Sequence, residues 1–300
     1  MQYTGSGNKI LWYFVVPFLI FFYIIFLFWA DSDFKYHNTA SLVAEKKRVS
    51  LASIESVGGI ILGGSNAFYG LRASTLSQFS ELRWANLALP AEGYSDENYW
   101  NFISGSLSNE QRLEVSNVIY SSATPFSSRF RDSKSLDLGG KKKLSYRPQY
   151  SLASYIKRFL GYSQLIPMPD EYGDFAFDNY DCDYLAVKAA QSFYYLAQND
   201  LTWWISKQVN QMKLLFPNAI IVISLPNGLQ TKDFDHASMD KIITSLRVAL
   251  QKHQLNSERS IYFSVQDPYP TASLMCNDSW HPNKFGREWR TKAFYEILGS

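Results

Sequence analysis

Short apolar runs alternate with helix-like stretches along most of the chain, and this alternation is the feature that most limits its fold. The predicted strands are 58–64, 84–89, 115–121, 219–225 and 260–265. The predicted helices are 96–108, 199–215, 236–254 and 284–297. Strands that alternate with helices favour a parallel sheet covered on both faces, and continuously apolar strands are typical of such a sheet. We therefore expect an α/β fold with a central parallel sheet.

The amino-terminal part of the chain contains an uncharged apolar run over residues 10–30. A helix of this length is roughly 31 Å long, which matches the hydrocarbon core of a bilayer. Trp12, Tyr13 and Trp29 lie near its two ends, where aromatic rings favour the lipid headgroups. A cleaved signal peptide has a shorter apolar core that ends in small residues, whereas Phe28 occupies that position here. We therefore predict one retained transmembrane helix after a tail of residues 1–9.

The rest of the chain divides into a stem and one larger domain. Residues 31–55 are polar without a strong period and predict a stem, and residues 56–300 predict a domain with an insertion at 126–180. The 300 residues carry 29 basic and 27 acidic side chains with no long basic run, so we expect no nucleic-acid partner. The lysines and arginines that flank the apolar run leave the side of the membrane undecided.

Ser65 is the first candidate for chemistry. It lies in Gly63-Gly64-Ser65-Asn66, directly after the first predicted strand. Ligands of open parallel sheets bind beyond the carboxyl ends of the strands, so a serine here points its hydroxyl toward that crevice. Backbone N–H groups of such a turn can also stabilise a developing negative charge. Taken alone, the same four residues are more typical of a glycine-rich turn with a capping serine.

The second candidate is the pair Asp278 and His281, which lies between the last predicted strand and the last predicted helix. Their spacing on a turn lets the carboxylate accept the proton on one ring nitrogen while the other nitrogen faces a nucleophile. His37, His236 and His253 lie in the stem or at the ends of a predicted helix. A metal site built from these histidines would lack adjacent ligands, so we predict no metal and no cofactor.

Together these motifs resemble the SGNH (GDSL-like) hydrolase superfamily. The resemblance rests on Gly63-Gly64-Ser65-Asn66, on Asn86-Leu87-Ala88-Leu89-Pro90-Ala91-Glu92-Gly93 and on Asp278-x-x-His281, and it spans about residues 57–297. It implies a three-layer flavodoxin-like sandwich, here in a membrane-anchored branch. It also implies Ser65 as nucleophile, His281 as general base and Asp278 as the residue that orients it. The backbone N–H groups of Ser65 and Gly93 would bind the oxyanion.

One block departs from the family pattern. The family places a Gly-x-Asn-Asp segment after the third strand, and its asparagine completes the oxyanion hole. Here that place reads Ser121-Ser122-Ala123-Thr124-Pro125. Losing one oxyanion donor costs about 2.7–4 kcal/mol in a serine protease. Ser122 and Thr124 are candidates for the missing donor, although both also fit a polar turn after a strand.

The resemblance implies an ester hydrolase or O-acyltransferase that forms an acyl-Ser65 intermediate. Because anchored relatives commonly act on exported glycans, we expect O-acyl groups, mainly O-acetyl, of an envelope polysaccharide outside the cytoplasm. A polytopic membrane acyltransferase is a candidate partner. The candidate substrate contacts are Asn66, Tyr180, Tyr184, Trp203 and Trp204, although core packing is the better interpretation for most of the aromatic rings.

Several alternatives stay open at this point. The domain is either an enzyme or a catalytically silent module that binds a glycan or scaffolds a membrane complex. The missing asparagine supports the silent module, and the intact set of Ser65, Asp278 and His281 opposes it. A lipase-like membrane esterase is a third interpretation. Hydrolysis and transfer are not separated, because they differ only in the acceptor that reaches the acyl-enzyme. Cys182 and Cys276 either pair in an oxidising compartment or stay free.

Overall fold

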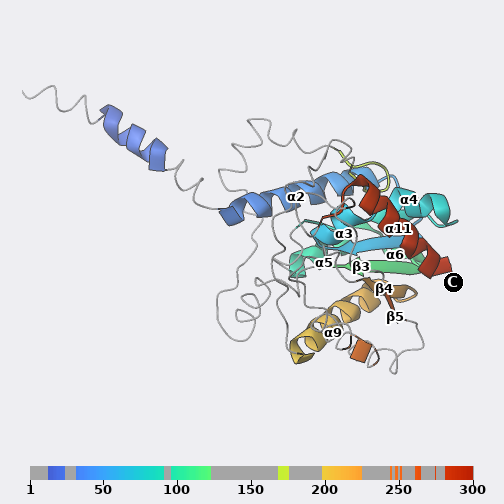
Figure 1. The fold of residues 1–300 in the computed structure, drawn as a ribbon. Coiled ribbons are helices and arrows are strands. Elements are labelled where there is room, and N and C mark those ends of the chain that lie inside the picture. Colours follow the sequence, from blue (N-terminus) through green and yellow to red (C-terminus); the bar gives the residue numbers. More distant parts are fainter. Residues whose placement is uncertain are drawn as a thin grey trace, which may run out of the picture.

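The computed structural model describes residues 13–23, 32–90, 96–122, 168–175, 198–224, 244, 247–248, 251, 261–264, 274 and 281–299 (Figure 1). For 32–41, 96–98, 198–201, 261–264, 297 and 299 the description covers the backbone alone. The helices are α2 (Ser32–Leu51), α3 (Ser65–Gly70), α4 (Ala73–Phe79), α5 (Asp96–Ser106), α6 (Asn109–Glu114), α9 (Gln198–Leu215) and α11 (Lys284–Gly299). The strands are β1 (Gly59–Gly63), β2 (Trp84–Asn86), β3 (Asn117–Ser121), β4 (Ile220–Ser224) and β5 (Ile261–Ser264).

The strands form a parallel sheet. Within the described residues it has five strands in the order β2-β1-β3-β4-β5, and each neighbouring pair is parallel. This order is flavodoxin-like. The chain adds β2 on one side of β1 and the later strands on the other side, so the strand order reverses between β1 and β3. The register aligns Gly63, Ser121, Ser224 and Ser264, so the carboxyl ends of four strands form one row of small residues. All five predicted strands are confirmed as apolar runs bounded by polar or glycine residues, and the four whose side chains are described, β1 to β4, are largely buried.

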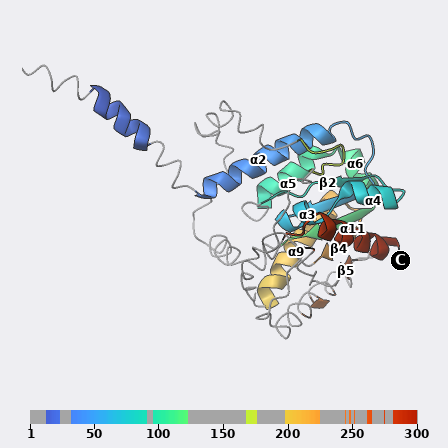
Figure 2. The same ribbon diagram turned by 45° about the horizontal axis from the view of Figure 1, so that its top comes forward.

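Helices cover both faces of the sheet. Successive side chains of a strand point to opposite faces, and β3 contacts a different helix on each. The ring of Tyr120 lies 5.6 Å from that of Trp204 on α9, whereas the Ser121 hydroxyl accepts a hydrogen bond from Arg290 on α11. Helices α3 and α4 pack against α11 and share its face (Figure 2). Right-handed crossovers place α5 and α6 on the α9 side, and the predicted α/β arrangement is confirmed.

The expected stem is helical over most of its length and packs on the domain. Val43, Lys47 and Leu51 recur every four residues on one side of α2, and all three are buried. Residues 168–175, the described part of the predicted insertion, lie against the outer edge of β2, where the Asn86 N–H donates to the Tyr172 carbonyl (2.7 Å). Because an open edge strand invites pairing with another chain, α2 and residues 168–175 protect β2.

Residues 13–23 form a helix with exposed, mostly apolar side chains. No helix within the described ranges combines the length and the apolar character needed to cross a bilayer. The predicted transmembrane run, 10–30, continues past both ends of this helix into residues outside the description. The predicted helix at 236–254 also lies largely outside it, whereas those at 96–108, 199–215 and 284–297 are confirmed within a few residues.

Candidate active site

The turn that joins β1 to α3 is built around two glycines. Gly63 has φ +124°, and a Cβ at this position would lie 1.9 Å from the Ser121 carbonyl oxygen, so only glycine fits. Its N–H donates to the Tyr99 hydroxyl (2.7 Å). The N–H of Gly64 donates to the same Ser121 carbonyl (3.1 Å). Ser65 therefore begins α3 at the carboxyl end of β1, where it is half-buried.

Asn66, directly after Ser65, is fully buried. Its side-chain Oδ1 accepts a hydrogen bond from the Ser121 hydroxyl (3.2 Å). Its carbonyl oxygen accepts one from Nη1 of Arg290 (2.9 Å). Both the main chain and the side chain of Asn66 thus support the turn, and its predicted contact with substrate stays a prediction.

Arg290 is the residue of this region that the sequence analysis did not identify. It is buried, and its Nη2 donates to the hydroxyls of Ser121 (2.8 Å) and Ser224 (3.0 Å). Burial lowers the pKa of Arg290 to about 9, which leaves it charged at neutral pH. The spacing of Arg287, Arg290 and Phe294 places them on one face of α11, and that face is buried. This spacing is the sequence signal that could have identified Arg290.

His281 lies three residues before the start of α11 and contacts α3. Its ring centre is 4.9 Å from that of Tyr69, in an edge-to-face arrangement. A Cβ on Gly70 would lie 3.5 Å from Cγ of Pro282, so the next residue is also close to α3. The structure therefore brings the segment that carries His281 against the short helix that Ser65 begins. Asp278, its predicted partner, lies outside the described residues.

The other predicted site residues have different surroundings. Ser122 follows β3 and is only 2% exposed. Trp204 is buried against Tyr120, whereas Trp203 is 40% exposed and has Nζ of Lys207 at 5.2 Å from its ring centre. The two indoles therefore do not form one continuous stacking surface. The predicted residues outside the described ranges are Gly93, Thr124, Tyr180, Tyr184, Cys182 and Cys276.

A second buried polar cluster lies at the carboxyl end of β2. Nζ of Lys47 donates to the Asn86 carbonyl (2.7 Å) and to its Oδ1 (3.0 Å). Nδ2 of Asn86 donates to Oδ1 of Asp174 (2.9 Å), whose Oδ2 accepts from the N–H and hydroxyl of Ser74 (2.8 and 2.9 Å). Burial lowers the pKa of Lys47 to about 7, and the carboxylates of Asp174 and Asp170 only partly offset this. The cluster fixes Asn86, which begins the 86–93 motif.

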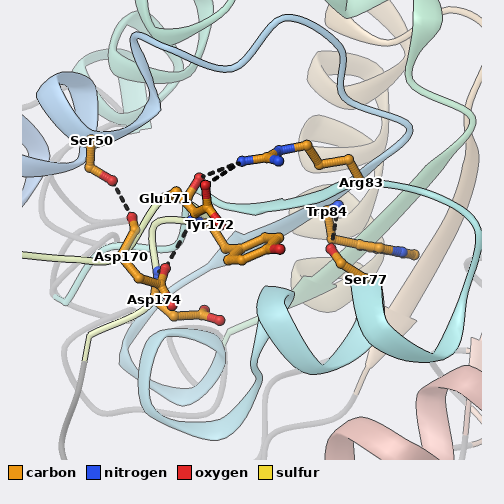
Figure 3. Close-up of polar contacts among 8 residues, drawn as sticks. All are labelled: Ser50, Ser77, Arg83, Trp84, Asp170, Glu171, Tyr172 and Asp174. Carbon is orange, nitrogen blue, oxygen red and sulfur yellow. Dashed lines mark hydrogen bonds and ion pairs between the residues drawn. The ribbon is translucent and has the colours of Figure 1, made fainter.

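Residues 170–174 form a compact turn beside this cluster (Figure 3). The Asp170 Oδ1 accepts from the N–H groups of Tyr172 and Asp174, both at 2.9 Å, and its carbonyl oxygen accepts from the Ser50 hydroxyl of α2. Burial and the nearby Asp174 raise the pKa of Asp170. In the part of the chain that the structure describes, no group of three or more His, Cys, Asp or Glu side chains could hold a metal ion.

Comparison with known proteins adds little. No protein-family model and no curated protein matches the chain. A solved structure from Streptococcus pneumoniae, of a protein proposed to be a platelet activating factor, is 10% identical with a TM-score of 0.42, over 87% of this chain and 92% of that chain. Phospholipase A1 from Streptomyces albidoflavus is 13% identical with a TM-score of 0.35, over 81% and 99%. At these values neither similarity establishes an activity.

Proposed function

We propose that the chain is a serine-dependent ester hydrolase or O-acyltransferase that forms an acyl-Ser65 intermediate. The observation that carries the proposal is the meeting of the turn after β1 with the segment before α11. His281 packs on Tyr69 of α3, and Arg290 binds the carbonyl of Asn66. These contacts put the segment of the proposed base beside the turn of the proposed nucleophile, which supports a reaction that needs both groups. The two segments meet at the carboxyl ends of the strands, beside the reversal between β1 and β3, where ligands of such sheets bind.

In the proposed mechanism, His281 accepts the proton of the Ser65 hydroxyl as Oγ bonds to the ester carbonyl carbon. Asp278 orients His281. The oxyanion accepts hydrogen bonds from the N–H groups of Ser65 and Gly93. The ester C–O bond then breaks, and the alcohol leaves with the proton from His281. Water or a sugar hydroxyl then attacks the carbonyl carbon of the acyl-serine and gives its proton to His281. The bond between the acyl carbon and the Ser65 oxygen breaks, and His281 returns the proton to Ser65.

As substrate we propose O-acyl groups, mainly O-acetyl, of an envelope polysaccharide. This part of the proposal rests on the SGNH resemblance of the motifs, because a fold alone does not define a substrate. The exposed indole of Trp203 supports a sugar-stacking contact, to which Tyr180 and Tyr184 would add. A polytopic membrane acyltransferase is the proposed donor of acyl groups in the transfer reaction.

We also propose that residues 10–30 anchor the chain in a membrane, with the domain outside the cytoplasm. The described part of this run supports an apolar partner, because Phe14 is 74% exposed and its described neighbours on the helix are exposed as well. An exposed apolar surface of this extent marks a site of contact with a membrane or with another protein.

A fluorophosphonate probe tests the proposed nucleophile on the detergent-solubilised full chain. We expect covalent labelling of Ser65 in the wild type and no labelling of Ser65→Ala or His281→Ala. Ser104→Ala, which removes an exposed hydroxyl on α5, is the matched control and should label normally. Acetyl and long-chain esters compared on the same protein separate a glycan deacetylase from a lipase-like esterase. A folded wild-type chain that stays unlabelled would contradict the proposal.

A catalytically silent module remains the second candidate function, and one observation favours it. The place of the family asparagine is taken by Ser121 and Ser122, and the side chain of Ser122 is almost completely buried. An oxyanion donor has to reach the substrate, so this burial weakens Ser122 as a replacement. In this case the folded wild type would bind O-acylated glycan without turnover and without labelling.

A further inference from the structure

The cluster around Arg290 joins the two halves of the proposed site through one side chain. Arg290 lies on α11, which begins three residues after His281. Its Nη1 binds the carbonyl of Asn66, the residue after Ser65. The residues that form this bond are 224 positions apart along the chain. A single guanidinium therefore links the helix that follows the proposed base to the turn that carries the proposed nucleophile.

We propose that Arg290 is a positioning residue that sets the placement of Ser65 relative to His281, an inference that rests on the proposed acyl-transfer function. Arg290 is 2% exposed, so it does not touch a substrate. It acts through Asn66, whose carbonyl it binds and whose side chain is held by Ser121. It also binds the hydroxyls of Ser121 and Ser224. The carboxyl ends of β3 and β4 and the turn after β1 are thus fixed by one group.

The shape of the guanidinium explains why an arginine serves here. Its planar fork presents donors in several fixed directions, so Nη1 and Nη2 reach three acceptors on three segments at the same time. A lysine presents one ammonium on a flexible stem and cannot span the same acceptors. The fold also leaves room for the fork: a Cβ on Gly70 would lie 2.4 Å from Nη1 of Arg290. Gly70 therefore belongs to the same arrangement.

The consequence for catalysis follows from the sensitivity of acyl transfer to geometry. A misplacement of about 1 Å caused by a remote substitution lowers the rate about 100-fold. Loss of Arg290 releases the Asn66 carbonyl and the Ser121 hydroxyl, both within the support of the Ser65 turn. The chemical step should slow, whereas substrate binding, to which Arg290 contributes no contact, should change little.

The test compares Arg290→Met and Arg290→Lys with the matched control Arg287→Met. Arg287 is an equally buried arginine one turn earlier on α11, and its Nη1 reaches the Phe175 carbonyl (3.5 Å) on residues 168–175. Fluorophosphonate labelling gives two readouts, the fraction of protein that is labelled and the rate constant of that fraction. For R290M we expect a limiting rate constant lower by about 100-fold, with the probe concentration that gives half of this rate within about twofold of the wild type. R290K should recover about tenfold of this loss, and R287M should keep the wild-type rate constant within about threefold.

A purely structural role gives a different pattern. If R290M lowers only the labelled fraction and the fraction that reacts does so at the wild-type rate, the inference is overturned. If R290M does not fold, Ser121→Ala and Ser224→Ala each remove one acceptor of the guanidinium, and we expect lower rate constants with intact labelled fractions. Unchanged rate constants in both serine variants also overturn the inference. An inert wild-type chain overturns the proposed function itself, whereas an active wild type beside an equally fast R290M overturns only the role of Arg290.

Discussion

Arg290 and Lys47 are both fully buried cations that bind a backbone carbonyl near the end of a strand, but their surroundings differ. Arg290 donates to the Asn66 carbonyl and to two serine hydroxyls at the proposed site. Lys47 donates to both oxygens of Asn86 at the edge of the sheet, and Asp174 bonds to the same asparagine. The first cation ties together the middle of the sheet, and the second ties α2 and residues 168–175 to its edge.

Arg290 and Lys47 also differ in their protonation near neutral pH. Burial lowers the pKa of Arg290 to about 9 and that of Lys47 to about 7. Arg290 therefore keeps its charge near neutral pH, whereas Lys47 changes protonation there. A guanidinium is the more weakly hydrated cation, and an ammonium loses its proton readily when buried. The support of the proposed site is thus insensitive to pH around neutrality, and the edge of the sheet is not.

The largest expected effect on the free energy of unfolding comes from two glycines, one in the turn after β1 and one in the turn beside the end of β2. Gly63 has φ +124° and would put a Cβ 1.9 Å from the Ser121 carbonyl, and Gly173 has φ +77° and would put one 2.6 Å from the Asn86 carbonyl. We expect Gly63→Ala to lower the free energy of unfolding by more than about 4 kcal/mol, and Gly173→Ala by about 1–3 kcal/mol. Urea unfolding measures both.

Gly105→Ala provides the control for the glycine substitutions. Gly105 lies within α5, and a Cβ there would meet Nη2 of Arg48 at an ordinary 3.5 Å. A glycine replaced by alanine inside a helix stabilises by up to about 1 kcal/mol. Equal losses in Gly63→Ala and Gly173→Ala would show that the turn after β1 is no more constrained than the edge of the sheet.

The second effect concerns Lys47 itself. Lys47→Met removes the ammonium that donates to Asn86, whose side chain in turn binds the buried carboxylate of Asp174, and we expect a loss of about 3 kcal/mol in the free energy of unfolding at pH 7. Glu45→Ala, which removes an exposed charge from the same helix, should change it by less than about 0.5 kcal/mol. A Lys47→Met protein as stable as the wild type would mean that the cluster at the edge contributes nothing.

Much of the fold follows from the sequence because its strands are simple. The five apolar runs are bounded by glycine or polar residues, and buried strands leave few other interpretations. The strand order is different, since no local pattern contains it, and it was expected only through the SGNH resemblance. The packing of α2 was missed for a physical reason: Lys47 occupies the middle of the stripe formed with Val43 and Leu51, and a lysine there reads as a solvent-facing residue.

The candidate site was predictable in part. Ser65 and His281 were proposed from their places after a strand and before a helix; the structure brings their two segments together at α3, and their catalytic roles stay predictions. Arg290 was not identified, because an arginine is expected on the outer face of a helix and its acceptors lie in three distant segments. The side chain of Asn66 binds the hydroxyl of Ser121, which is 55 positions away, and no local sequence pattern indicates such a contact.

The smallest effect, and the most direct test of the difference in charge, is the pH dependence of stability. Lys47 has an unperturbed pKa of 10.5 and a folded-state pKa of about 7. Between these values the unfolded chain binds more protons, so the free energy of unfolding rises with pH, by at most about 1.4 kcal/mol per pH unit from this one group. Below pH 7 Lys47 is protonated in both states, and its contribution to the slope vanishes.

Urea unfolding at pH 7, 8 and 9 therefore separates the two cations. The wild type should gain stability relative to Lys47→Met over this interval, because only the wild type carries the group that titrates in it. Arg290, whose pKa is lowered to about 9, stays charged in both states until the upper end of the interval. The free energy of unfolding of Arg290→Met should consequently change with pH as that of the wild type does from pH 7 to pH 8. Parallel curves for Lys47→Met as well would show that Lys47 keeps an ordinary pKa and that both clusters hold a fixed charge.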